Sequence, residues 1–193
     1  FPFVGKERSP AFFGGRSFFI CTGNPGVLPL SNHRDRIDRK KMNKRHALLF
    51  GEIKSAVDSD MDSDDVIRFV CQMLFDGVPH FDWVGVYRCV PEREALVLGP
   101  YSGEETEHEE IPYGSGVCGR VARSGQKLVV ADVSTEENYI ACSLQVRSEA
   151  VVPVKRAGQT IAVLDVDSFT PDGFSREDVE LLEGVAEEIV PFI

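Results

Sequence analysis

The sequence has no long hydrophobic run. Within its 193 residues, no uninterrupted apolar stretch approaches the roughly 20 residues that cross a bilayer. The N-terminal segment also lacks the apolar core and small-residue cleavage site of a secretory signal peptide. We therefore expect no membrane partner and a cytoplasmic location.

Lysine and arginine are scarce beyond the first 41 residues. That segment holds eight of the 21 Lys/Arg and three of the 31 Asp/Glu, which leaves 13 basic against 28 acidic residues in positions 42–193. A body with so large a negative excess repels phosphate backbones. Nucleic acid is therefore not an expected partner.

The cysteines lack the paired spacing of a metal site. Their number is odd, and no two form a CxxC pair: Cys21, Cys71, Cys89, Cys118 and Cys142. No metal ligands are predicted, and structural disulfides are unfavourable in a cytoplasmic protein. A disulfide here would be transient and catalytic.

Residues 1–41 lack sustained hydrophobic periodicity, because Gly, Pro and Ser are scattered through them. We expect them to be a disordered or non-native extension, and residues 42–193 to form one domain. The alternative is a native flexible arm that docks its phenylalanines, among them Phe12 and Phe18.

Residues 42–193 show a mixed pattern of helices and strands. Helices are predicted for residues 43–57, for a segment that begins at the capping residue Ser63, for residues 117–123 and for a segment that begins at a capping box on Ser175. Strands are predicted for residues 81–89 and 95–101, for residues 127–133 as a buried strand, and for a hairpin that turns at 156–159. This order indicates an α+β fold, with a central antiparallel sheet and with helices from both terminal segments packed on one sheet face.

The second strand of the predicted hairpin carries two carboxylates on an otherwise apolar face. Alternation places Ile161, Val163, Asp165 and Asp167 on one side. A buried carboxylate without a partner is costly unless its pKa rises or a cation meets it. The pattern fits either a pocket or a strand end that emerges into solvent.

Two aromatic residues share a face of the strand at 81–89. Trp83 and Tyr87 lie four positions apart, so they can wall a small-molecule site or simply fill a core.

Two cysteines lie in candidate reactive positions. Cys118, in GSGVCG, opens a short helix whose N-terminus favours a thiolate. Cys142 follows 24 residues later in the polar segment NYIACSLQVRSE, which ends on a third carboxylate, Glu149.

Five motif blocks together resemble one family. WVGVY, GSGVCGRVA, DVSTEENYIACS, SEAVVPV and IAVLDVDS occur in this order, and they are similar to those of the GAF-domain free methionine-(R)-sulfoxide reductases. The resemblance implies a GAF fold and thiol-dependent reduction of free L-methionine-(R)-sulfoxide. It implies no bound cofactor, and a thioredoxin-type dithiol that recharges the cysteines.

The resemblance also assigns roles to single residues. It implies that Cys142 is the nucleophile and forms a sulfenic acid, which Cys118 converts into an intramolecular disulfide; the reverse order stays open. Glu149 is the candidate acid or sulfoxide-orienting group.

Four further residues are implied to bind the substrate. Asp165 and Asp167 would hold its ammonium group, Trp83 would contact its methyl group and Tyr87 would hydrogen-bond to it. Backbone N–H groups in the turn 114–117 are candidates for its carboxylate.

The sequence departs from the family pattern at three positions. His108 stands where many members have a third cysteine, and YIACS, with Tyr139 and Ser143, replaces HIACD. The alternative function is a non-catalytic GAF domain that senses a small molecule or redox state, and a homodimer is compatible with either reading.

Overall fold

The computed structural model describes residues 43–57, 61–136, 139–140 and 143–193, so Cys142 and residues 1–41 lie outside the described part. Its sheet has six strands in the order β3-β2-β1-β6-β5-β4, and every neighbouring pair is antiparallel. The strands are β1 (Trp83–Val90), β2 (Ala95–Ser102), β3 (Glu110–Pro112), β4 (Leu128–Val130), β5 (Ser148–Arg156) and β6 (Gln159–Ser168). The predicted α+β fold with a central antiparallel sheet is confirmed.

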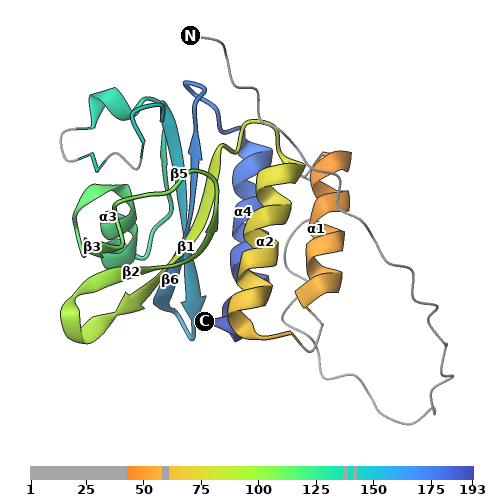
Figure 1. Ribbon diagram of the computed structural model, residues 1–193, viewed down its shortest axis with the longest axis horizontal. Coiled ribbons are helices and arrows are strands. Elements are labelled where there is room, and N and C mark those ends of the chain that lie inside the picture. The colour runs from red at the N-terminus through yellow and green to blue at the C-terminus, as the bar shows by residue number, and fades with distance from the viewer. Residues whose placement is uncertain (1–42, 58–60, 137–138, 141–142) are drawn as a thin grey trace, which may run out of the picture. The chain divides into compact units, whose positions relative to one another are not determined.

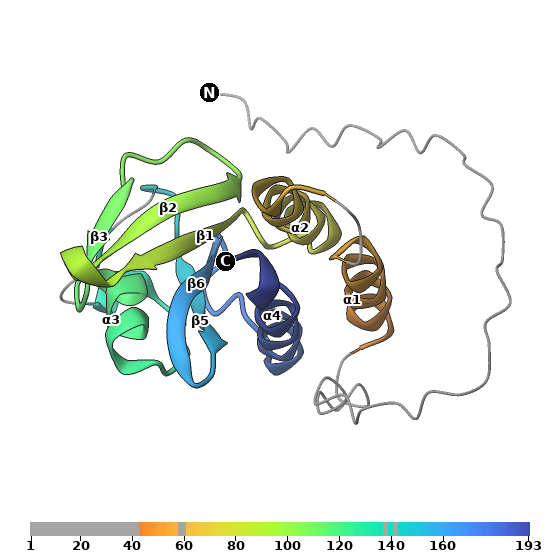
Figure 2. The same cartoon turned by 90° about the horizontal axis from the view of Figure 1, so that it is seen from below.

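Four α-helices in the described ranges lie on the two sides of this sheet. They are α1 (Lys44–Val57), α2 (Ser63–Gly77), α3 (Gly116–Ser124) and α4 (Arg176–Glu188). In Figure 1, α1, α2 and α4 lie on one side of the sheet and α3 on the other, and the view from below in Figure 2 agrees. No helix in the described ranges combines the length and the apolar character that crossing a membrane requires.

Helix α3 is the exception to the expected packing of helices on one sheet face. It buries Val117, Cys118 and Val121 in an apolar cluster with Tyr87 and Val151 from the sheet. The short strands β3 and β4, which precede and follow α3, pair at opposite edges of the sheet. The chain therefore crosses the face opposite the other three helices, where the candidate site lies.

Helix capping is partly as predicted. Asp62, not Ser63, caps α2, since its side chain accepts a hydrogen bond from the Asp64 N–H at 2.9 Å. The predicted capping box of α4 is confirmed, because Ser175 and Asp178 exchange side-chain to backbone hydrogen bonds. Both caps satisfy N–H groups that a helix leaves without partners in its first turn.

The two outermost strands are short. β3 and β4 contain three residues each, and Val129 of β4 is 40% exposed. The strand predicted for residues 127–133 therefore forms only over Leu128–Val130, and the expectation that it is buried was wrong. An apolar run alone cannot distinguish an edge strand from a central one.

Candidate functional site

Strand register brings the predicted carboxylates to one face of the sheet. Asp167 pairs with Trp83 of β1 and with Glu149 of β5, while Asp165 pairs with Gly85 and Val151. Residues paired across antiparallel strands point to the same face. Trp83, Glu149, Asp165 and Asp167 therefore all project toward the side that carries α3.

Cys118 meets two of these carboxylates. It lies in the first turn of α3, and its sulfur and one oxygen from each of Glu149 and Asp165 all lie within 4.8 Å of one another. The three side chains are buried. Because Glu149 is diagonal to Asp165 across adjacent strands, its longer side chain reaches the same point.

Burial dominates the electrostatics of the carboxylates. It raises the pKa of Asp165 to about 6, although contacts with the Cys118 thiol, with Glu149 and with the Val166 N–H oppose the rise. The pKa of Glu149 is raised well above its usual value by burial and then by the charges of Asp165 and Asp167. Burial and the charge of Asp165 likewise raise the pKa of Asp167.

In the part of the chain that the structure describes, no cation lies beside these carboxylates. Within the described residues, no Lys, Arg or His forms an ion pair with Glu149, Asp165 or Asp167. All four oxygens of Asp165 and Asp167 are buried, and within the described residues none of them accepts a hydrogen bond of good geometry. Such groups cost stability unless a ligand supplies positive charge.

Trp83 forms a wall of the site. Its indole stacks on Tyr101, with ring centroids 5.4 Å apart, and its Nε1–H donates to the Glu104 carbonyl at 3.1 Å. The indole also crosses Gly85, since a Cβ there would lie 2.6 Å from Cζ3 of Trp83. Gly85 faces Asp165 across the strands, so this glycine makes room for an aromatic ring beside a buried carboxylate.

Tyr87 lies next to Trp83 but deeper. The two ring centroids are 6.2 Å apart, and Tyr87 is fully buried. Its hydroxyl donates to the His108 carbonyl at 3.1 Å. This bond uses the hydroxyl proton, so toward a ligand Tyr87 can offer an oxygen acceptor or its ring.

Residues flanking the position of Cys142 lie against this region. The Ile140 side chain packs on Gly116, at the start of α3, where an added Cβ would be 3.2 Å from Cγ1 of Ile140. Tyr139 packs against the apolar cluster that contains Trp83, Tyr87 and Cys118. The segment before Cys142 thus reaches the same face as Cys118.

The turn before α3 offers fewer N–H donors than expected. The N–H of Gly114 donates to the Gly119 carbonyl at 2.8 Å, and the N–H of Ser115 donates to the Pro112 carbonyl at 3.0 Å. Gly116 and Val117 donate to no acceptor within the described ranges. Only these two of the four candidate groups stay available for an anionic ligand.

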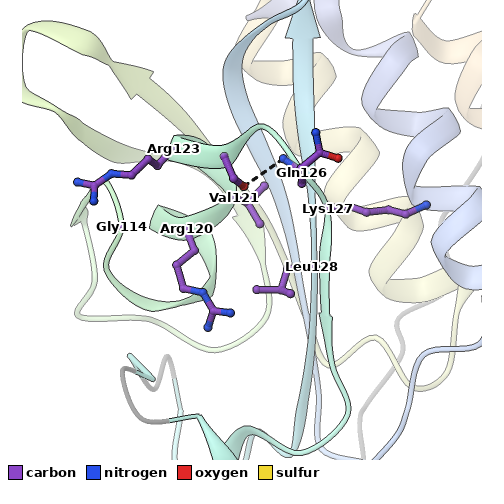
Figure 3. Close-up of a pocket in the computed structure, with 8 residues that line it drawn as sticks. Gly114, Arg120, Val121, Arg123, Gln126, Lys127 and Leu128 are labelled. Atoms are coloured by element: carbon purple, nitrogen blue, oxygen red, sulfur yellow. Dashed lines mark hydrogen bonds between the residues drawn. The ribbon is translucent and has the colours of Figure 1, made fainter.

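A basic groove of about 400 Å³ lies along α3 and the start of β4. In Figure 3 its cationic side chains, Arg120, Arg123 and Lys127, point in different directions. Each already has an anionic or carbonyl partner: Glu136, the Tyr113 carbonyl and Glu183 respectively. The groove therefore presents no converging donors for one anion.

Some residues of the region escaped prediction. Gly85 and Tyr101 determine the position of Trp83. The sequence offered one indication of this, because a glycine inside a strand often marks the close approach of another group. A second polar cluster, far from Cys118 in sequence, contains the buried Asp178, whose carboxylate oxygens lie 3.2 Å from Nε2 of His46 and 3.2 Å from Nε2 of His80. No local motif marks that contact.

Comparison with known proteins supports the architecture. The GAF domain family model matches residues 63–190. The chain is 41% identical over 109 residues to Protein ZMO0507 of Zymomonas mobilis, covering 56% of this chain and 66% of that protein. It is 33% identical over 117 residues to the free methionine-R-sulfoxide reductase of Escherichia coli, covering 61% and 69%. The alignments thus span about two thirds of each relative.

A solved structure extends the similarity. The chain is 33% identical to the free methionine-R-sulfoxide reductase from Neisseria meningitidis, whose structure holds its substrate. The TM-score is 0.72, and the superposition covers 78% of this chain and 90% of that one.

Proposed function

The chain belongs to the GAF domain family and is related to the free methionine-R-sulfoxide reductases, and from this premise we propose that it reduces free L-methionine-(R)-sulfoxide to methionine with its own thiols. One observation carries the proposal. Three buried carboxyls, which form no ion pair within the described residues, share one sheet face, and two of them lie directly beside a cysteine, Cys118.

The charges of this group suit a free amino acid. With a pKa of about 6, Asp165 is ionised at neutral pH, while burial and the charges of neighbouring carboxylates raise the pKa of Glu149 and of Asp167 and so favour their protonated forms. The ionised carboxylate of Asp165 supplies one negative charge, which matches one ammonium. A peptide-bound methionine sulfoxide has no ammonium and would leave that charge uncompensated.

The remaining contacts orient the substrate. The N–H groups of Gly116 and Val117 are donors for the substrate carboxylate. Trp83 contacts the terminal methyl group with its indole face. Tyr87 lines the deeper side through its ring, because its hydroxyl proton is used by the His108 carbonyl.

The chemistry follows from a thiolate beside a protonated acid. The Cys142 thiolate attacks the sulfoxide sulfur while Glu149 delivers a proton to the sulfoxide oxygen. The oxygen moves to the cysteine as a sulfenic acid, and methionine leaves as the thioether. The Cys118 thiol then attacks the sulfenic sulfur, which forms a disulfide and releases water. An external thioredoxin-type dithiol reduces that disulfide by exchange.

The test is NADPH consumption coupled through thioredoxin reductase and thioredoxin, with free methionine-R-sulfoxide as substrate. We expect turnover with the R epimer and none with the S epimer. Cys142→Ser and Cys118→Ser should each abolish turnover. Cys89→Ser is the matched control, because Cys89 is half-buried next to Tyr113, and this variant should retain activity.

Two outcomes would reject the proposal. One is the absence of turnover while a known reductase works in the same mixture. The other is full activity of Cys142→Ser. Saturable binding of the sulfoxide by the wild type without any turnover would instead support a sensor.

A further inference from the structure

The Cys118–Glu149–Asp165 cluster has the composition of a metal site. One sulfur and two carboxylate oxygens lie within 4.8 Å of one another, and all three side chains are buried. Ligand atoms around a tetrahedral Zn²⁺ are roughly 3.5 Å apart, given bond lengths of about 2.0–2.3 Å. The three ligand atoms are at most 4.8 Å apart, which exceeds the spacing around Zn²⁺ by little more than about 1 Å. Rotation of the side chains can close this difference.

The burial of the cluster separates it from an ordinary acidic patch. Surface carboxylates are hydrated, whereas Asp165 is fully buried and neither of its oxygens has a well-formed hydrogen bond to any described residue. Asp167, equally buried, adds a further carboxyl on the same strand face. A divalent cation would compensate the negative charge of these groups more completely than their partial protonation does.

We propose that Cys118, Glu149 and Asp165 form a binding site for a thiophilic divalent cation such as Zn²⁺. A thiolate favours Zn²⁺, Co²⁺ or Cd²⁺ over Mg²⁺ and Ca²⁺, which prefer ligand sets made only of oxygen. Three protein ligands leave a fourth position for water or another group. The sequence predicted no metal, because the ligands are spread over 48 positions from 118 to 165 and only the fold unites them.

Occupation would have a functional consequence that rests on the proposed function. The cation would take the oxygens assigned to the substrate ammonium and would hold the Cys118 sulfur away from the sulfenic acid. Zn²⁺ should therefore inhibit reduction competitively with methionine sulfoxide. The metal would act as a reversible inhibitor and not as a cofactor.

The experiment is a Co²⁺ titration of the reduced full-length protein, followed by optical absorption. We expect a near-ultraviolet thiolate-to-Co²⁺ charge-transfer band that saturates at one ion per chain and disappears on addition of Zn²⁺. Cys118→Ser should abolish the band. Asp165→Asn and Glu149→Gln should each weaken Co²⁺ binding at least about 10- to 100-fold, because the loss of a residue that only supports a metal ligand already lowers metal affinity by this factor. Cys89→Ser should leave the titration unchanged.

Three results would overturn the metal site. They are the absence of a saturable band, a band that persists in Cys118→Ser, and equally strong binding of Mg²⁺ in competition. Circular dichroism of each variant shows whether it is folded, and the two isosteric carboxamide variants test the site if Cys118→Ser does not fold. The optical readout requires no turnover, so an inactive protein that binds Co²⁺ would refute the proposed function and leave this inference intact.

Discussion

Replacement of Gly85 by alanine adds a single methyl group and tests whether the Trp83 indole packs as closely over this position as the structure shows. Gly85 lies in the middle of β1, opposite Asp165, and under the Trp83 indole. A Cβ at this position would be 2.6 Å from Cζ3 of Trp83. Carbon atoms in contact are normally about 3.5–4.0 Å apart, so the indole must move by about 1 Å or more.

The indole has little freedom to move. It stacks on Tyr101 and donates a hydrogen bond to the Glu104 carbonyl, and Gly103 is in close contact with its other edge. Added volume in such a packed region costs about 1–3 kcal/mol. The melting temperature should fall by about 2–4 °C for each kcal/mol lost. In the proposed function the displaced ring no longer matches the substrate methyl group, so KM should rise more than kcat falls.

The assay uses the fact that Trp83 is the only tryptophan of the chain. Its emission reports on this site alone, and since Trp83 is 4% exposed, displacement toward solvent should shift the emission to the red. Gly51→Ala is the control, because no atom lies within 4 Å of the added Cβ and alanine should stabilise α1 by about 0.5–1 kcal/mol. Unchanged emission and melting temperature in Gly85→Ala would refute the packing argument.

Three further perturbations have expected signs. Asp178→Asn should lower the free energy of unfolding by about 1–3 kcal/mol at neutral pH, because hydrogen bonds from His80 and Ser175 hold the pKa of Asp178 below its usual value against the effect of burial. In urea titrations this loss should shrink as the pH falls below 3.8 and through the lowered pKa, and a loss that does not change with pH would contradict this role. Asp167→Asn should act in the opposite direction. Because burial raises the pKa of Asp167, the wild type loses stability as the pH rises above 3.8, and the variant should be the more stable protein at neutral pH. A variant less stable than the wild type at neutral pH would contradict the conclusion that the Asp167 carboxyl lacks a compensating charge. N-acetyl methionine-R-sulfoxide has no ammonium, so kcat/KM should fall at least about 30-fold, or about 2 kcal/mol, and equal rates would remove the proposed role of the carboxyls.

Local patterns predicted much of this domain. Alternation along β6 placed Asp165 and Asp167 on one face, and the register with β1 and β5 confirms that they share it with Trp83 and Glu149. The turn of the β5–β6 hairpin and the capping box at Ser175 were also readable, because each depends on neighbouring residues.

Long-range placement could not be predicted in the same way. That α3 crosses the face opposite α1, α2 and α4 depends on where β3 and β4 pair, and the apolar residues of β4 resemble those of a central strand. The contacts of Asp178 with His46 and His80 join segments far apart in sequence. The position of Cys142 relative to Cys118 stays a prediction.

The short strands at the two ends of the sheet bear on the solubility of the domain. An outer strand exposes backbone groups that can recruit a strand from another molecule, and the hazard grows with its length. Here β3 ends in Pro112, which has no N–H to donate, and β4 spans only Leu128–Val130 with Lys127 directly before it. Variants in which β3 or β4 is lengthened with β-branched residues should therefore polymerise through edge-to-edge strand pairing, even where their folded monomer is as stable as that of the wild type.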